Sequence, residues 1–142
     1  MKKKIKILEF RVDAKSAMPI YEQIKEVIKY NVISGTLVSG DRLMSLRDLA
    51  MRIKIHPNTI VKAYYQLEVE GFIESKPGKG YFVKQNRKIF SKAKKDVFEK
   101  SVREFISKST KLGFGMDDIF KELKKIDKER TMRKSEEKDD RN

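Results

Sequence analysis

The sequence predicts a mainly helical α+β fold, and three observations lead to this prediction. Apolar residues recur at the three- and four-residue spacing of one helix face in three segments before residue 70. The second and third of these segments are separated by only a few residues. Two short runs, 72–75 and 80–84, flank Pro77-Gly78-Lys79-Gly80, whose glycines suit a hairpin turn. Two helices joined by a tight turn and followed by a hairpin are the element order of a winged helix-turn-helix, which places one helix in a DNA major groove.

The first elements lie at the N-terminus. Apolar residues alternate approximately over residues 5–12, which predicts a short strand there. Met18-Pro19 predicts the start of a helix, because proline suits the first helical turn, and Gly35 predicts its end. The apolar face of this helix comprises Ile20, Ile24, Val27, Ile28 and Val32. A connecting loop over residues 36–42 follows.

The helix-turn-helix motif follows this loop. Ser45 can cap the second helix with its hydroxyl group, and Lys54-Ile55 form the turn between the helices. Pro57 suits the first position of the third helix, and Gly71 suits the position just after its end. The stripe of the third helix that we expect to be buried comprises Ile60, Ala63, Tyr64 and Leu67.

The C-terminal part of the chain has a different character. Polar residues at 84–88 predict a linker, and the spacing of apolar residues beyond it predicts a long amphipathic helix followed by a shorter one. Several of these apolar side chains are too large to stay uncovered on two helices, so we expect the same helices of a second copy to cover them. The residues expected at this dimer contact are Phe98, Val102, Phe105, Ile106, Phe120 and Leu123.

Three parts of the chain are therefore expected. They are a winged helix-turn-helix domain (1–86, with the motif at 45–64 and the wing at 72–84), a helical dimerisation extension (87–127) and a charged end (128–142). The end carries almost no apolar residue that could join a core, so we expect it to be disordered.

Composition narrows the possible partners. The formal net charge is +13, which favours a polyanion, and nucleic acid before an anionic membrane. A lysine-rich surface without such a partner is the plain alternative. The absence of cysteine excludes disulfides, thiolate catalysis and cysteine metal sites, and it fits a reducing cytoplasm. No stretch approaches the roughly 20 apolar residues of a membrane span, so we expect no membrane partner.

An enzyme is not expected. His56 is the only histidine, which leaves neither a zinc site nor a base to activate a serine nucleophile. The glycine-lysine pattern at residues 78–80 is too short to be a phosphate loop. We therefore expect no catalytic residue, no metal and no cofactor.

The third helix carries the main candidates for DNA contact, because the N-terminal part of a recognition helix meets base edges and phosphates. Asn58 can hydrogen-bond adenine, and Thr59 can reach a phosphate or a thymine methyl group. Val61 is expected on the same exposed side as Lys62 and Tyr65. Taken alone, Asn58 and Thr59 could equally be plain helix-start residues. The order of the elements is what favours DNA contact. The candidates from this helix are His56, Pro57, Asn58, Thr59, Lys62 and Tyr65.

The second helix and the hairpin supply further candidates. Arg47 lies in the first turn of the second helix, a position that approaches the DNA backbone or the groove edge, although a solvated arginine is the alternative. In the hairpin, cations at the tip can meet phosphate or the minor groove, or can serve only to keep exposed strand edges from pairing. The hairpin candidates are Lys76, Gly78, Lys79 and Gly80. Arg42 is expected only to support its loop.

These segments resemble the GntR family of bacterial transcription regulators. The resemblance rests on PIYEQI at 19–24, SGTLVSGDRL at 34–43, SLRDLA at 45–50 and NTIVKAYYQLEVEGFIESKPGKGYFV at 58–83. It implies that Arg47, the Asn58-Thr59 pair and the two wing glycines occupy the DNA-binding positions of the family. The N-terminal strand expected before PIYEQI and the short two-helix tail resemble the YtrA-type branch.

Three positions depart from the family pattern. Met44 stands where a proline is usual before the cap, which loosens that loop. Pro57 stands where an arginine is usual, as in many YtrA-like sequences, so one base-contacting side chain is lost. Gly115 stands where a serine or threonine usually caps the last helix, and it is a weaker cap.

The resemblance also implies a function. The YtrA-type branch comprises small dimeric repressors that often control neighbouring ABC-transporter genes, so we expect a homodimeric repressor of such an operon, bound to an inverted-repeat operator in double-stranded DNA. A nonspecific or architectural nucleic-acid binder and a protein-binding adaptor stay open as alternatives. A small-molecule inducer of unknown identity could act at the dimer or the domain junction through rotation about the polar linker. Protein level alone could equally set operator occupancy.

Overall fold

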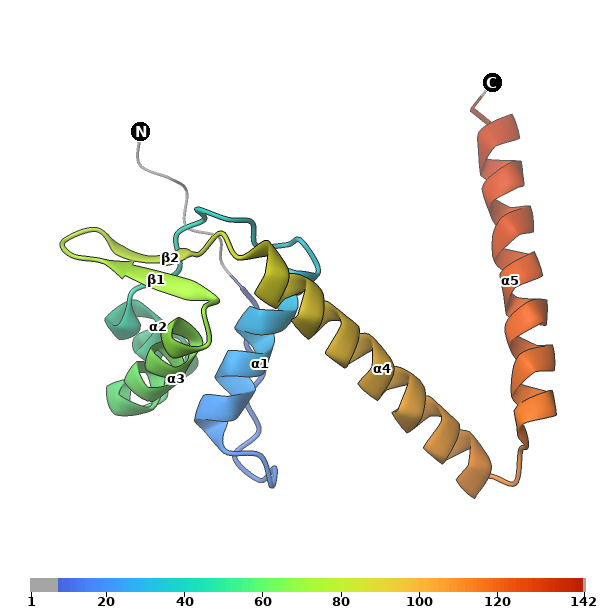
Figure 1. The fold of residues 1–142 in the computed structure, drawn as a ribbon, viewed down its shortest axis with the longest axis horizontal. Coiled ribbons are helices and arrows are strands. Elements are labelled where there is room, and N and C mark those ends of the chain that lie inside the picture. Colours follow the sequence, from blue (N-terminus) through green and yellow to red (C-terminus); the bar gives the residue numbers. More distant parts are fainter. Residues whose placement is uncertain (1–7, 142) are drawn as a thin grey trace. The chain divides into compact units, whose positions relative to one another are not determined.

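The computed structural model describes residues 8–141, and it divides into two compact units between Lys95 and Asp96. The first unit contains α1 (Ile20–Ile33), α2 (Leu46–Ile53), α3 (Pro57–Val69), β1 (Ile73–Lys76), β2 (Gly80–Val83) and the start of α4 (Arg87–Lys111) (Figure 1). The second unit contains the rest of α4 and α5 (Met116–Asp139). These elements confirm the predicted fold class, a mainly helical α+β protein with a winged helix-turn-helix.

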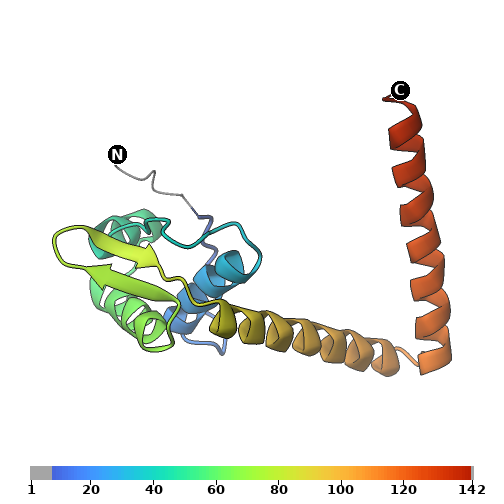
Figure 2. The ribbon, with the colours of Figure 1, turned by 45° about the horizontal axis from the view of Figure 1, so that its top comes forward.

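The core of the first unit lies where α1 and α2 pack against α3. The helices contribute the buried faces that their apolar spacing predicted. The largest fully buried side chains are Ile24, Ile28, Leu37, Leu49, Ile60, Tyr64, Leu67, Ile73 and Val83. Since this set includes residues from both strands, the hairpin is anchored in the same core as the helices, and Figure 2 shows it extending past α2 and α3.

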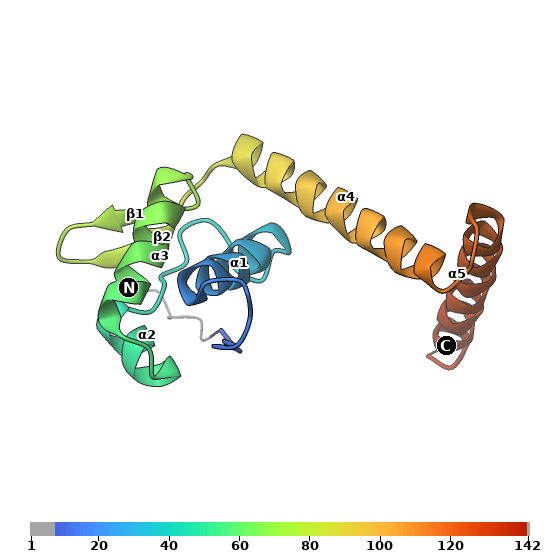
Figure 3. The same ribbon diagram turned by 90° about the horizontal axis from the view of Figure 1, so that it is seen from below.

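The helix-turn-helix motif forms through local contacts that the sequence indicates. The hydroxyl oxygen of Ser45 accepts a hydrogen bond from the Asp48 N–H at 3.1 Å, which confirms the predicted cap of α2. Lys54 then adopts a left-handed conformation with φ of 56°, and this conformation ends α2. The buried Tyr64 of α3 donates its phenol proton to the Met44 carbonyl at 2.8 Å, which ties the loop before α2 to α3. Figure 3 shows α2 next to the start of α3, with the hairpin extending to one side of α3.

The wing is a two-stranded antiparallel hairpin. Its register pairs Ile73 with Val83 at the base and Lys76 with Gly80 next to the tip. Gly78 and Gly80 have φ of 72° and 111°, which is the positive-φ geometry expected from their place in the turn. An isolated bridge between Arg42 and Phe82 adds the loop before α2 to the free edge of β2. The predicted hairpin is confirmed, and the bridge places Arg42 beside β2.

The N-terminal strand is the first departure from expectation. Residues 8–12 form no strand, and the expected positions Ile5 and Ile7 lie outside the described residues. Leu8 is buried, and Phe10 and Val12 pack against the core. Within residues 8–141 this segment pairs with no strand. Its alternating apolar residues are therefore explained by side chains that pack against the helical core.

The linker predicted at residues 84–88 is also wrong. The N–H of Lys84 donates to the Phe72 carbonyl at 3.0 Å, and α4 already begins at Arg87. The Phe90 ring stacks on Phe72 with centroids 5.4 Å apart. The first turns of α4 therefore belong to the first unit, and the segment without helix or strand is limited to residues 84–86.

The charged C-terminal segment differs as well, because α5 continues to Asp139 where disorder was expected from residue 128. Lysine, arginine and glutamate have high helix propensity, so a highly charged segment can continue a helix without joining a core. At its start, the Gly115 N–H donates to the Asp118 carboxylate at 2.9 Å, but no cap side chain accepts a hydrogen bond from the first N–H groups of α5, in line with the weak cap expected of glycine. Within residues 8–141, no helix is long and apolar enough to cross a membrane.

Candidate nucleic-acid interface

The start of α3 is set by His56 and Pro57. Pro57 occupies the first helical turn, and the Nδ1 atom of His56 accepts a hydrogen bond from the Asn58 N–H at 3.2 Å. This contact needs a lone pair on Nδ1, so the proton of the neutral ring sits on Nε2. His56 thus caps the helix that carries the predicted contacts, and its exposed ring edge at Nε2 is left as a hydrogen-bond donor.

One face of α3 is open to solvent over its first turns. Val61 and Tyr65 are exposed to 46% and 66%, and Asn58 and Lys62 are also exposed. Thr59 is half-buried, so less of its side chain is open to solvent than that of Asn58. The opposite face carries the core residues of α3, so the fold can present only this one face to a groove.

The side chain of Lys62 is directed toward α1. Its ammonium group lies 3.8 Å from the centroid of the Tyr21 ring, a cation–π contact. The sequence predicted that Lys62 would share the groove-facing side with Asn58. It does lie on the exposed face, but its charge is held at the edge of that face by an aromatic ring from another helix.

The wing presents cations on a rigid hairpin. Lys79 is exposed at the tip, and the Lys76 ammonium lies 4.8 Å from the Phe82 ring centroid and 3.7 Å from a carboxylate oxygen of Glu74. The Ser75 N–H donates to the Glu68 carboxylate of α3 at 3.0 Å. This bond links the wing directly to α3, the other predicted contact region.

Two arginines flank these elements. Arg47 is exposed in the first turn of α2, as predicted. Arg42 packs its guanidinium against the backbone of Gly80, where an added Cβ would lie 3.3 Å from the Arg42 Nε atom. The half-buried Arg42 is therefore a wing cation as well as a loop residue. No spacing in the sequence identifies it, because the contact depends on the bridge to β2.

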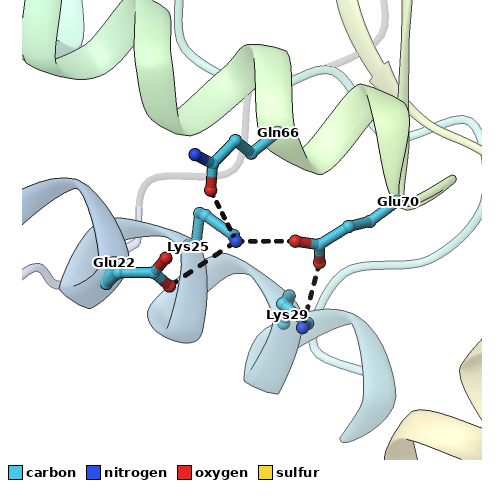
Figure 4. A network of polar contacts seen from close by, with 5 residues as sticks. All are labelled: Glu22, Lys25, Lys29, Gln66 and Glu70. Carbon is cyan, nitrogen blue, oxygen red and sulfur yellow. Dashed lines mark hydrogen bonds and ion pairs between the residues drawn. The ribbon is translucent and has the colours of Figure 1, made fainter.

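A polar network joins α1 to the C-terminal end of α3 (Figure 4). The Lys25 ammonium is buried and lies 2.6 Å from one carboxylate oxygen of Glu70, 2.8 Å from the Gln66 amide oxygen and 3.5 Å from Glu22. Lys29 contacts the other Glu70 oxygen at 3.1 Å. The network fixes the end of α3 against α1, and sequence periodicity gave no signal for it apart from a lysine next to the apolar face of α1.

The charges of this network shift its pKa values. Burial on its own lowers the pKa of Lys25, but the hydrogen bond and charge of Glu70, with a smaller contribution from Glu22, outweigh it and raise the pKa. Burial likewise raises the pKa of Glu70, but the hydrogen bonds and charges of Lys25 and Lys29 outweigh it and lower the pKa. Both groups are therefore charged at neutral pH. Burial also raises the pKa of Tyr64, so its phenol stays a hydrogen-bond donor.

The second unit carries the residues expected at a dimer contact. Phe98, Phe105 and Phe120 are exposed to 68%, 45% and 55%. Val102 and Leu123 are exposed too, and Ile106 is half-buried. A hollow of about 700 Å³ lies between the end of α4 and the start of α5, lined by apolar groups including Phe105, Leu112, Phe114 and Ile119. This is a large apolar surface for two helices that make few contacts with each other.

A smaller hollow lies where the sequence placed a domain junction. It measures about 310 Å³ and is lined by residues from the end of α1, the loop at Ser39 and the start of α4, among them Phe90 and Arg87. The inducer stays a prediction. Among residues 8–141 there is no group of three or more histidine, cysteine, aspartate or glutamate side chains that could hold a metal ion.

Known proteins share this architecture. The family of bacterial regulatory proteins called gntR matches residues 20–83, which run from α1 to the end of β2. The HTH-type transcriptional repressor YtrA of Bacillus subtilis is 44% identical over 78 residues, covering 55% of this chain and 60% of that protein. A regulator named YhcF, also from Bacillus subtilis, is 38% identical over 74 residues and is covered to 61%. The match thus spans about 60% of the length of these relatives.

Solved structures extend the similarity to most of the chain. A GntR family transcriptional regulator from Listeria monocytogenes is 32% identical with a TM-score of 0.67, over 78% of this chain and 97% of that one. YtrA from Sulfolobus acidocaldarius, a GntR-family transcription factor, is 29% identical with a TM-score of 0.52, over 84% and 97% of the two chains. The motifs at α1, α2, α3 and the wing, together with these matches, show that the chain belongs to the gntR family of bacterial regulatory proteins.

Proposed function

We propose that this protein is a sequence-specific DNA-binding transcriptional regulator that acts in the cytoplasm as a dimeric repressor. The observation that carries the proposal is the exposed face of α3, which presents Asn58, Val61 and Tyr65 to solvent, while α2 and the wing carry exposed cations of their own. In a winged helix-turn-helix, such a face enters the major groove while flanking cations contact phosphate. The net charge of +13 favours the same partner.

The dimer is supported by the second unit. A pair of helices that exposes three phenylalanines gains by covering them, and a second copy offers an identical apolar surface. Two copies would place two recognition helices on two half-sites of an inverted repeat, about 10 base pairs apart or a multiple of that distance. The repressor activity and the transporter operon rest on resemblance. One relative is named a repressor, and the YtrA-type branch often controls transporter genes.

The proposed specificity can be tested by selecting bound duplexes from a random pool with the full-length protein. We expect an inverted repeat, bound at least about 1,000-fold more tightly than a scrambled duplex at the same salt concentration. A nonspecific or architectural binder would show an equally steep salt dependence but a ratio near one. A protein-binding adaptor would bind neither duplex at moderate salt.

The proposed dimer can be tested by sedimentation of the full-length protein at micromolar concentration. Phe105→Asp and Phe120→Asp should each shift the protein to a monomer, because each places a charge in the surface that a partner would cover. Met132→Asp is the matched control, since Met132 is 68% exposed on α5 and does not line the hollow. A monomeric wild type would contradict this assignment of the second unit.

A further inference from the structure

We infer that α3 contacts A·T rather than G·C base pairs, and that Val61 recognises the methyl group of a thymine next to an adenine bound by Asn58. The inference rests on the proposed function and specifies the DNA sequence class that the recognition helix accepts. It follows from which side chains of α3 are free to meet a base edge and which are already engaged by α1.

The helix offers almost no chemistry for guanine. The usual contact to guanine is a bidentate hydrogen bond from arginine or lysine to O6 and N7. The sequence of α3 is PNTIVKAYYQLEV, which contains no arginine and one lysine, Lys62. The ammonium group of that lysine lies over the Tyr21 ring at 3.8 Å. It can contact a phosphate at the groove edge, but a base contact would require it to leave the ring.

A second polar side chain is also engaged. Gln66 could otherwise bind adenine through its amide, but its amide oxygen accepts a hydrogen bond from the buried Lys25 ammonium at 2.8 Å, and the residue is half-buried. Turning the amide toward DNA would remove one of the few acceptors around a buried charge. Contacts with α1 therefore take both Lys62 and Gln66 out of direct base recognition.

The side chains left on the open face are Asn58, Val61 and Tyr65. They lie three and four residues apart and so follow one another along a single face of the helix. The amide of Asn58 matches the N6 and N7 atoms of adenine. The 46%-exposed Val61 is apolar, and the only apolar group that the major groove offers is the thymine methyl. A cytosine or guanine there would lose water from a polar edge without gaining a hydrogen bond.

The spacing of the two residues is compatible with neighbouring base pairs. Three residues advance an α-helix by about 4.5 Å, while base pairs along one strand are about 3.4 Å apart. Asn58 and Val61 can therefore contact adjacent base pairs from one helix orientation. Arg47 lies on α2, and His56, with its Nε2–H donor, precedes α3, so a guanine bound by either residue lies outside the pair assigned to Asn58 and Val61.

The experiment uses the full-length protein and the best duplex from the selection described above. Asn58→Ala and Val61→Ala first identify the base pairs whose preference each variant relaxes. The thymine assigned to Val61 is then replaced by uracil, which removes only the methyl group. We expect the wild type to lose about fourfold in affinity, the factor for burying one methyl-sized group. The affinity of Val61→Ala should fall by less than about twofold on the same replacement, because most of the methyl contact is already gone.

Val69→Ala is the matched control, because Val69 is 69% exposed at the opposite end of α3. Its loss on the uracil duplex should equal that of the wild type. The inference is overturned if the base pairs assigned to Asn58 and Val61 are G·C, or if uracil costs the wild type and Val61→Ala the same factor. Failure of the wild type to prefer any duplex would instead refute the proposed function, so the two failures are distinguishable.

Discussion

Replacing Glu70 with glutamine tests the network that fixes the end of α3. The substitution keeps a hydrogen-bonding group near Lys25 but removes the charge that balances the buried ammonium. Removing one partner of a fully buried ion pair costs about 3–5 kcal/mol, whereas an exposed pair contributes about 0–1 kcal/mol. The Lys25 side chain is 7% exposed but Glu70 is 34% exposed, and Glu22 still lies 3.5 Å from the ammonium. We therefore expect a loss of about 2 kcal/mol in the free energy of unfolding.

The loss can be measured by urea and thermal unfolding of the full-length protein. For a unit of this size, about 2 kcal/mol corresponds to a fall in Tm of roughly 10 °C. Glu122→Gln is the control, because the Glu122–Lys125 pair is 3.8 Å long and exposed to more than half on both sides. It should change stability by less than about 0.5 kcal/mol. If Glu70→Gln were equally mild, the reasoning from burial would be refuted.

The same variant carries a pH dependence. The folded pKa of Glu70 is lowered, so its contribution is present above the unfolded value of about 4.3 and is lost as the pH falls through the folded value. The folded pKa of Lys25 is raised, so its contribution is present below about 10.4 and is lost as the pH rises through the folded value. The difference between wild type and Glu70→Gln should be largest between about pH 5 and 10, and it should shrink in acid.

Three further substitutions test other contacts. Tyr64→Phe removes the 2.8 Å bond to the Met44 carbonyl and should cost about 1 kcal/mol in urea unfolding; no loss would mean that water replaces the phenol. Gly71→Ala should cost about 1–2 kcal/mol, because φ is 85° and the new Cβ would lie 2.9 Å from the Ile89 Cδ1 atom; an unchanged midpoint would contradict the packed junction. Lys79→Ala should weaken binding to specific and random DNA alike, and it should reduce the slope of log affinity against log salt concentration by about one per half-site. A loss of affinity confined to the specific duplex would make Lys79 a base contact.

The sequence predicted the helix-turn-helix and the wing because their signals are local. The Ser45 cap, Pro57 in the first turn of α3 and the wing glycines each act within a few residues, so a correct reading needs no knowledge of distant partners. The buried stripe of α3 was predicted for the same reason. These are also the residues that position the candidate interface, which explains why its location was accessible from the sequence.

The features that the sequence missed depend on contacts between distant segments. The polar residues at 84–88 predicted a linker, and they gave no sign that Phe90, just beyond them, stacks on Phe72. The direction of the Lys62 side chain depends on Tyr21 of another helix. Leu8 and its neighbours alternate like a strand, but residues 8–12 have no strand beside them. Periodicity reports which side chains are buried and does not report what covers them.

The packed start of α4 decides where the DNA-binding half of the protein can be cut. Ile89, Phe90 and Ala93 pack against the same core as α1 and α3. A fragment ending at Asn86 would lack Phe90, so it would expose Phe72 at the base of the wing. Its weak binding to DNA would then report damage to the wing as well as the loss of a partner chain. A fragment ending at Lys95 keeps those contacts, and so it is the shorter protein in which the affinity of a single half can be measured.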